Sequence, residues 1–151
     1  MNKPYETDYY GWANEQAALL RAGKLSLADI DNIAEEIESM GKGEKRELVN
    51  RLIVLLQHLL KWEYQPEQRS RSWSTTITIQ RDQIARLILD NPSLKPKIDE
   101  AMHDAYKAAR LQAAVETDLK ASTFPAYNPY SWAKAMDDCF WPGPALPGIE
   151  P

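Results

Sequence analysis

The chain of 151 residues contains little cysteine, little histidine and no long apolar run. Its single cysteine, Cys139, excludes an internal disulfide framework and a CxxC metal knuckle. The longest uninterrupted apolar run covers the five residues 52–56, whereas a membrane-spanning helix needs about 20 residues. The first twelve residues contain acidic and tyrosine side chains but no apolar stretch typical of a signal peptide. We therefore expect a cytoplasmic protein without a membrane-spanning segment.

Positive charge is also in short supply. The 18 Lys and Arg residues are outnumbered by 22 Asp and Glu residues, so the net charge is −4. Sequence-independent nucleic-acid binding depends on clustered basic residues that neutralise phosphates. Nucleic-acid binding is therefore the weakest functional hypothesis, since it would need the arginines of residues 69–86 to form one exposed basic face.

Proline is absent between Pro4 and Pro66 and between Pro96 and Pro125, so both intervals are free to be helical. Apolar residues recur there every three to four positions, which predicts an all-α fold. The stretch 73–80 is rich in β-branched residues, but no second strand candidate exists to pair with it, and we expect a helix there. The expected helices span about 7–22, 26–43, 44–64, 73–91 and 93–120, with a short one after Asn128.

These helices predict a single domain over residues 4–142, followed by an irregular Pro/Gly tail at 143–151. The helix at 44–64 is apolar around nearly half of its circumference, so we expect a bundle of five to six helices around it. Ser26 and Ser93 are the expected N-caps of the second and fifth helices. Gly41 and Gly43 are expected to interrupt or kink the second helix, whose apolar stripe consists of Ile30, Ile33, Ile37 and Met40.

Polar residues on the expected apolar faces are candidates for a site, because burying them unpaired costs about 1–3 kcal/mol. Gln80 and Arg81 interrupt the stripe of the helix at 73–91, and Gln112 and Glu116 interrupt that of the helix at 93–120. One interpretation is a structural ion pair of Glu116 with a nearby arginine such as Arg81. The other is an anion or polar-ligand pocket, with candidate residues Arg69, Arg71, Trp73, Gln80, Arg81 and Gln112.

Signals for catalysis are few. His58 and Glu116 are weak acid/base candidates, because a histidine at the margin of an apolar helix is usually a packing residue. Glu100 and His103 form half of a di-iron motif, but no second Glu-x-x-His is present. The acidic residues 31, 35 and 38 share a helix face, which is typical of a solvated surface rather than a magnesium site. We therefore expect no metal site and no cofactor.

Several segments together carry a family resemblance. They are YETDYYGWANEQAALLRAGK, NIAEEIESMGKGEKRELVNRL, HLLKWEYQPEQRSRSW, QRDQIARLI, ETDL, FPAYNPYSW and FWP. The chain resembles the bacterial family catalogued as the twenty-ninth domain of unknown function, over about residues 4–142. The resemblance implies a small all-helical domain with no established activity, and it transfers no catalytic residue. One departure is Asp118, where the resemblance leads us to expect glycine.

Two functional hypotheses remain besides nucleic-acid binding. The first is a helical domain that acts through self-association or by docking a protein partner, because five tryptophans and seven tyrosines are of the types enriched at contact surfaces. The same aromatic residues are equally suited to filling a core. The second hypothesis is a small-ligand or anion-binding protein, or an enzyme, with an Arg/Trp-lined pocket.

Overall fold

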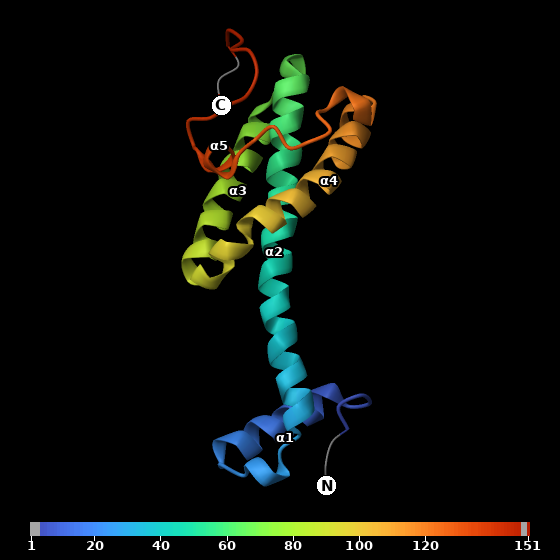
Figure 1. The fold of residues 1–151 in the computed structure, drawn as a ribbon, viewed down its shortest axis with the longest axis vertical. Helices are drawn as coiled ribbons and strands as arrows, with labels where there is room; N and C mark the ends of the chain where they lie inside the picture. The colour runs from blue at the N-terminus through green and yellow to red at the C-terminus, as the bar shows by residue number, and fades with distance from the viewer. Residues whose placement is uncertain (1–3, 149–150) are drawn as a thin grey trace. The chain divides into compact units, whose positions relative to one another are not determined.

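The computed structural model describes residues 4–148 and 151, and it divides the chain into two compact units (Figure 1). Unit 1 spans residues 1–43 and unit 2 spans residues 44–151. The α-helices of the described residues are α1 (Tyr9–Arg21), α2 (Ile30–Tyr64), α3 (Arg71–Asp90), α4 (Ile98–Thr117) and α5 (Trp132–Met136). Short 3₁₀ turns cover Leu25–Leu27, Pro66–Gln68, Pro92–Lys97 and Ala121–Thr123. These residues contain no β-strand, and the predicted all-α class is confirmed.

Helix α2 differs from the sequence prediction, because the two helices expected on either side of Gly41 and Gly43 are one. Neither glycine adopts a positive φ angle. Each costs the helix only about 1 kcal/mol relative to alanine, and good helix formers flank both. The helix therefore continues from one unit into the other.

The expected caps at Ser26 and Ser93 are also wrong. Ser26 lies in the 3₁₀ turn Leu25–Leu27, and α2 begins only at Ile30. Ser93 lies in the turn Pro92–Lys97, and α4 runs from Ile98 to Thr117 instead of to about residue 120. Asp118 ends α4 with a φ angle of 58°, the left-handed conformation in which glycine is favoured.

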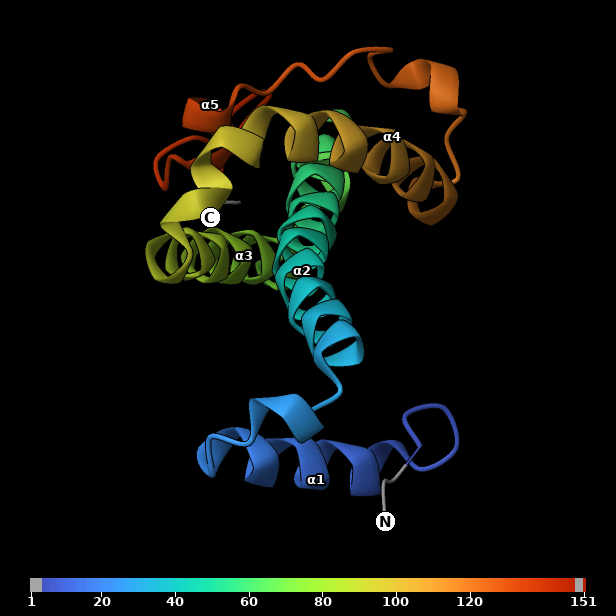
Figure 2. The ribbon, with the colours of Figure 1, turned by 60° about the horizontal axis from the view of Figure 1, so that its bottom comes forward.

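The core of unit 2 forms around α2, as the apolar pattern predicts. Leu48, Leu52, Leu55, Leu56, Leu59 and Leu60 are fully buried. They lie between α3 and α4, which flank this part of α2 (Figure 2). Helix α4 contributes four fully buried alanines, at positions 101, 105, 109 and 113. Small side chains on one face let α4 pack closely against its neighbours.

The segment after α4 packs on the same core. Phe124 and Tyr130 are buried, and the Tyr130 hydroxyl donates to Glu63 Oε1 at 2.8 Å. The Pro144 carbonyl accepts a hydrogen bond from Arg69, so the beginning of the expected Pro/Gly tail is attached to unit 2. Residues 149–150 of that tail lie outside the described residues.

Unit 1 is a helical hairpin made of α1, the turn Leu25–Leu27 and the first turns of α2. Its described residues bury Trp12 and Gln16. The Trp12 indole donates to Asp29 Oδ2 at 2.9 Å, and the Asp29 backbone N–H donates to Gln16 Oε1 at 2.7 Å. The hydroxyls of Tyr5 and Tyr9 donate to the two carboxylate oxygens of Glu36. These bonds fix α1 against the start of α2.

Candidate functional site

Arg81, one of the predicted ligand residues, is only 2% exposed, and it binds backbone carbonyls. Its Nε donates to the Ala135 carbonyl and its Nη2 to the Phe140 carbonyl, each at 2.7 Å. The guanidinium lies 5.2 Å from the centre of the Trp141 ring. Burial lowers the pKa of Arg81, and the nearby Asp138 and Asp137 oppose that shift. Arg81 therefore attaches the C-terminal segment to α3.

Arg69, two residues before α3, has the same role. Its Nε donates to the Trp62 carbonyl at 2.8 Å, its Nη1 to Pro144 at 2.6 Å and its Nη2 to Pro142 at 3.1 Å. Its guanidinium lies 4.8 Å from the centre of the Trp62 ring. We call Arg69 and Arg81 together the arginine clamp. Four of its hydrogen bonds go to carbonyls of residues 135–144, and Arg81 Nη1 is buried without a hydrogen-bond partner among the described residues.

The other predicted pocket residues are dispersed. Arg71 is exposed at the start of α3, and Gln112 is exposed on α4. Gln80 is half-buried and accepts a hydrogen bond from Arg51 at 3.4 Å. A surface pocket of about 690 Å³ does adjoin Arg81, but Asp82 and Asp138 also line it, and their charge disfavours an anion there.

Trp73 and Glu116 line the same pocket, which has a volume of about 280 Å³. The other lining residues are Gln65, Gln68 and Thr117. Glu116 does not pair with Arg81. Its partner is Lys61 of α2, whose Nζ lies 2.6 Å from Glu116 Oε2 and 4.6 Å from the centre of the Trp73 ring. The hydrogen bond from Lys61 lowers the pKa of Glu116. The Glu116 side chain is 48% exposed, so the expectation of a buried carboxylate is wrong.

Sequence reasoning missed Lys61, which is only 6% exposed. The signal was its position inside the apolar run LLKW at 59–62, where a charged side chain requires a partner. His58 lies one turn earlier, with Nδ1 2.8 Å from the Val54 carbonyl. Burial lowers the pKa of His58, and the charges of Lys61 and Glu116 act on it with opposite signs. The candidate acid/base residues therefore share one neighbourhood, but the arginines do not join them.

Unit 1 exposes much of its apolar side-chain area. Three residues of the predicted stripe on α2 are open to solvent: Ile30 is 51% exposed, Ile37 63% and Met40 70%. Leu25 and Leu27, in the turn before α2, are 59% and 61% exposed. The stripe stays exposed because α1 donates its hydrogen bonds to Asp29, just before α2, and to Glu36, on the neighbouring face of α2. We call these five residues the 25–40 apolar surface.

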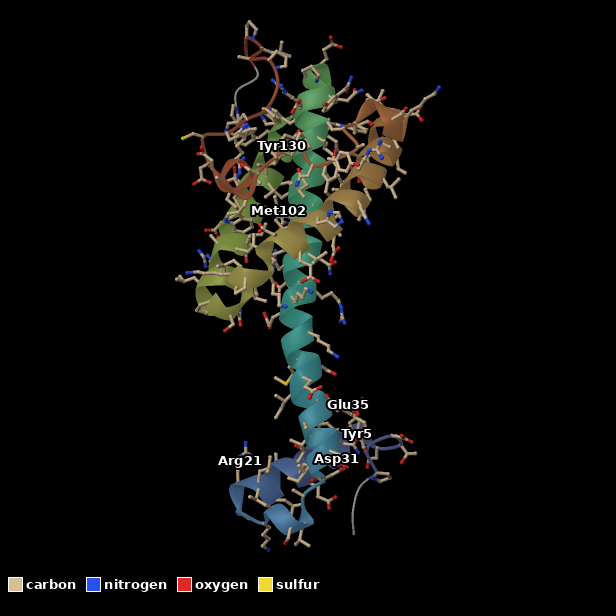
Figure 3. All side chains as sticks on the ribbon, viewed as in Figure 1. Tyr5, Arg21, Asp31, Glu35, Met102 and Tyr130 are labelled. Carbon is tan, nitrogen blue, oxygen red and sulfur yellow. The ribbon has the colours of Figure 1, made fainter. Side chains whose placement is uncertain are left out.

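The acidic residues Asp31, Glu35 and Glu38 are exposed near the start of α2, and Figure 3 labels the first two of them. Unit 1 contains four basic and eight acidic residues, hence −4, whereas unit 2 contains fourteen of each. The net charge of the chain therefore lies in unit 1. Within residues 4–148 and 151, no three His, Cys, Asp or Glu side chains are grouped to hold a metal ion.

The family described as "Domain of unknown function DUF29" matches residues 4–141. The chain belongs to this family. The DUF29 match covers the 25–40 apolar surface and most of unit 2, and it ends just before Pro142 and Pro144, whose carbonyls bind Arg69. No curated protein and no solved structure matches the chain. In the described part of this DUF29 chain, no helix combines the length and apolar character needed to cross a bilayer.

Proposed function

We propose that this DUF29 chain is a protein-docking domain whose contact site is the 25–40 apolar surface. The observation that carries the proposal is the exposure of all five residues of that surface to more than half of their area. Single exposed apolar residues are ordinary, but a group of them on one short hairpin is typical of an interaction site. Covering one such side chain contributes about 1.5–3 kcal/mol.

The aromatic residues support the proposal less than the sequence suggests. Trp12, Trp62, Tyr106 and Tyr130 are buried in one unit or the other and serve packing. The exposed aliphatic residues of unit 1 are therefore the stronger argument for docking.

A partner other than a second copy is favoured by charge. Two copies of unit 1 would each bring a net charge of −4 to the contact. Like charges placed across an interface cost free energy and slow association. The anion-binding alternative is weaker, because the arginine clamp donates to backbone carbonyls and Arg71 is exposed at the start of α3.

Site-specific photo-cross-linking tests the proposal. A photoreactive residue replaces Ile37 in the full chain, and a matched control places it at Leu89, which is 79% exposed in unit 2. We expect position 37 to yield one reproducible cross-linked protein in cells, identified by mass spectrometry, that position 89 does not yield. Equal products from both positions, or products containing only a second copy of the chain, would contradict the proposal.

A further inference from the structure

The chemistry of the partner follows from the charges around the 25–40 apolar surface. At about 100° per residue, Met40, Ile37 and Ile30 lie within an arc of about 80° on α2. Glu38, Asp31 and Glu35 follow on one side of that arc, within about a further 140° from Ile30. The exposed part of α2 therefore presents an apolar strip with an acidic border.

The acidic border is available to a partner. The ion pairs found among the described residues lie within unit 2, and none of them involves Asp31, Glu35 or Glu38. At about 100° per residue Lys42 falls on the same side of α2, one turn after Glu38, so its charge offsets one of the three. The hydrogen bond to Glu36 and, to a smaller extent, the negative charge of Glu35 raise the pKa of the Tyr5 hydroxyl, so Glu35 lies within electrostatic reach of Tyr5. Two net negative charges remain beside the apolar strip.

We infer that the docked segment is a basic amphipathic helix of another protein, an inference that rests on the proposed docking function. A helix with apolar residues at i, i+3, i+4 and i+7 buries its apolar face against a strip of this kind. Lys or Arg residues beside that face then pair with Asp31, Glu35 and Glu38. The same border repels an anionic membrane or a nucleic acid, and it repels a second copy of unit 1.

Model peptides test the inference on the full chain. The probe is a peptide of about 18 residues with one leucine stripe flanked by Lys and Arg, a length that becomes helical on binding. A second peptide carries the same stripe with Glu in place of the basic residues, and a third scrambles the basic peptide so that the stripe is lost. Binding is measured by fluorescence anisotropy at two salt concentrations.

Two variants of the chain report on the two parts of the surface. Ile37→Ser with Met40→Ser removes apolar area, and its control is Leu89→Ser in unit 2. Asp31→Asn with Glu35→Gln and Glu38→Gln removes the acidic border. Its control, Glu67→Gln with Asp90→Asn and Asp104→Asn, removes three exposed carboxylates from unit 2.

We expect the basic peptide to bind at least ten times more tightly than the acidic or the scrambled peptide. Each unit 1 variant lowers that affinity at least fivefold, and neither control lowers it twofold. Equal binding of the basic and acidic peptides would overturn the inference, and the cross-linking at position 37 would decide the docking function separately. Binding that survives both unit 1 variants, or equal binding of the scrambled peptide, would also overturn it.

Discussion

Gly143 and Gly148 both adopt positive φ angles, of 85° and 77°, but their surroundings differ. A Cβ atom at Gly143 would lie 2.9 Å from Arg69 Nη2 and 3.2 Å from the Glu63 carbonyl oxygen, whereas nothing lies within 4 Å at Gly148. The left-handed conformation alone costs a residue with a side chain about 1–2 kcal/mol. Only Gly143 has a clash in addition, because the clamp and the chain pass so close to it.

We therefore expect Gly143→Ala to lower the free energy of unfolding by about 2–4 kcal/mol and Gly148→Ala by about 1 kcal/mol. Urea unfolding followed by tryptophan fluorescence measures both, since Trp62 and Trp141 lie next to the clamp. Equal losses for the two variants would show that the contacts at Gly143 carry no energy.

His58 gives a prediction with a definite sign. Burial lowers its pKa below 6.5, the Lys61 charge lowers it further, and the Glu116 charge raises it. Glu116→Gln is expected to lower the pKa of His58, and Lys61→Met to raise it. An NMR titration of the imidazole protons measures both, with His103→Gln to assign the signals. Shifts of the same sign in both variants would contradict the geometry.

The sign also sets how His58 affects stability. The pKa of His58 is lower in the folded than in the unfolded state, so folding favours the neutral imidazole. Its contribution to the free energy of unfolding is therefore fully present above about pH 6.5. It is lost as the pH falls through the lower folded-state pKa. We expect Glu116→Gln to move that loss to lower pH.

Individual polar residues were predictable as exceptions to the pattern, but their partners were not. The sequence marks Arg81 and Glu116 as polar residues on apolar faces, and opposite charge then suggests that they pair. In the folded chain Arg81 binds carbonyls of a segment more than fifty residues later, and Glu116 binds Lys61. Backbone carbonyls have no signature in a sequence, so the arginine clamp could not be inferred from residue types.

The C-terminal segment, residues 135–144, depends on the arginine clamp for its position. A lysine at position 81 cannot donate to both the Ala135 and the Phe140 carbonyls in the manner of the planar guanidinium. A buried carbonyl that loses its donor costs about 1–3 kcal/mol. The clamp therefore contributes more to unit 2 than a surface ion pair would.

We expect Arg81→Lys to lower the free energy of unfolding by about 2–3 kcal/mol and to expose residues 135–144 to proteolysis. The matched control is Arg86→Lys, because Arg86 is 69% exposed and pairs with Asp82 on the surface of the same helix. That control is expected to cost less than about 0.5 kcal/mol. Urea unfolding and limited proteolysis with mass spectrometry measure the two effects. Unchanged cleavage in the Arg81 variant would show that other contacts hold the segment.

The helices themselves were largely predictable, since periodic apolar residues determine which stretches become helical. The two glycines of α2 misled the prediction because their cost in a helix is small beside the sum of propensities of their neighbours. The starts of α2 and α4 were displaced because 3₁₀ turns occupy Leu25–Leu27 and Pro92–Lys97. Local sequence distinguishes such turns poorly from the first turn of an α-helix.

The two units differ in how much they bury. Among the described residues, unit 1 buries Trp12 and Gln16, while the leucines of α2 in unit 2 are fully enclosed. Local opening requires little free energy where few apolar contacts are lost. The same low burial leaves the 25–40 apolar surface open, so docking and local stability are linked.

We expect hydrogen exchange to be faster for the backbone amides of residues 9–21 than for those of residues 48–62, by at least a hundredfold. Hydrogen–deuterium exchange with mass spectrometry measures this on the full chain. Ile37→Ser serves as a control, since it changes an exposed residue and leaves the core of unit 2 intact. Equal protection of the two ranges would contradict the expectation and would instead indicate one cooperative domain over residues 4–142.

The arginine clamp has a consequence for how the protein is made. Arg69 and Arg81 leave the ribosome more than fifty residues before the carbonyls of residues 135–144 that they bind. Until Ala135, Phe140 and Pro144 have been added, a guanidinium buried in the growing core would have N–H donors without these carbonyl acceptors. The hairpin of unit 1 has all of its internal partners much earlier. Translation therefore presents the amino-terminal hairpin to the cell before the rest of the chain is able to finish folding.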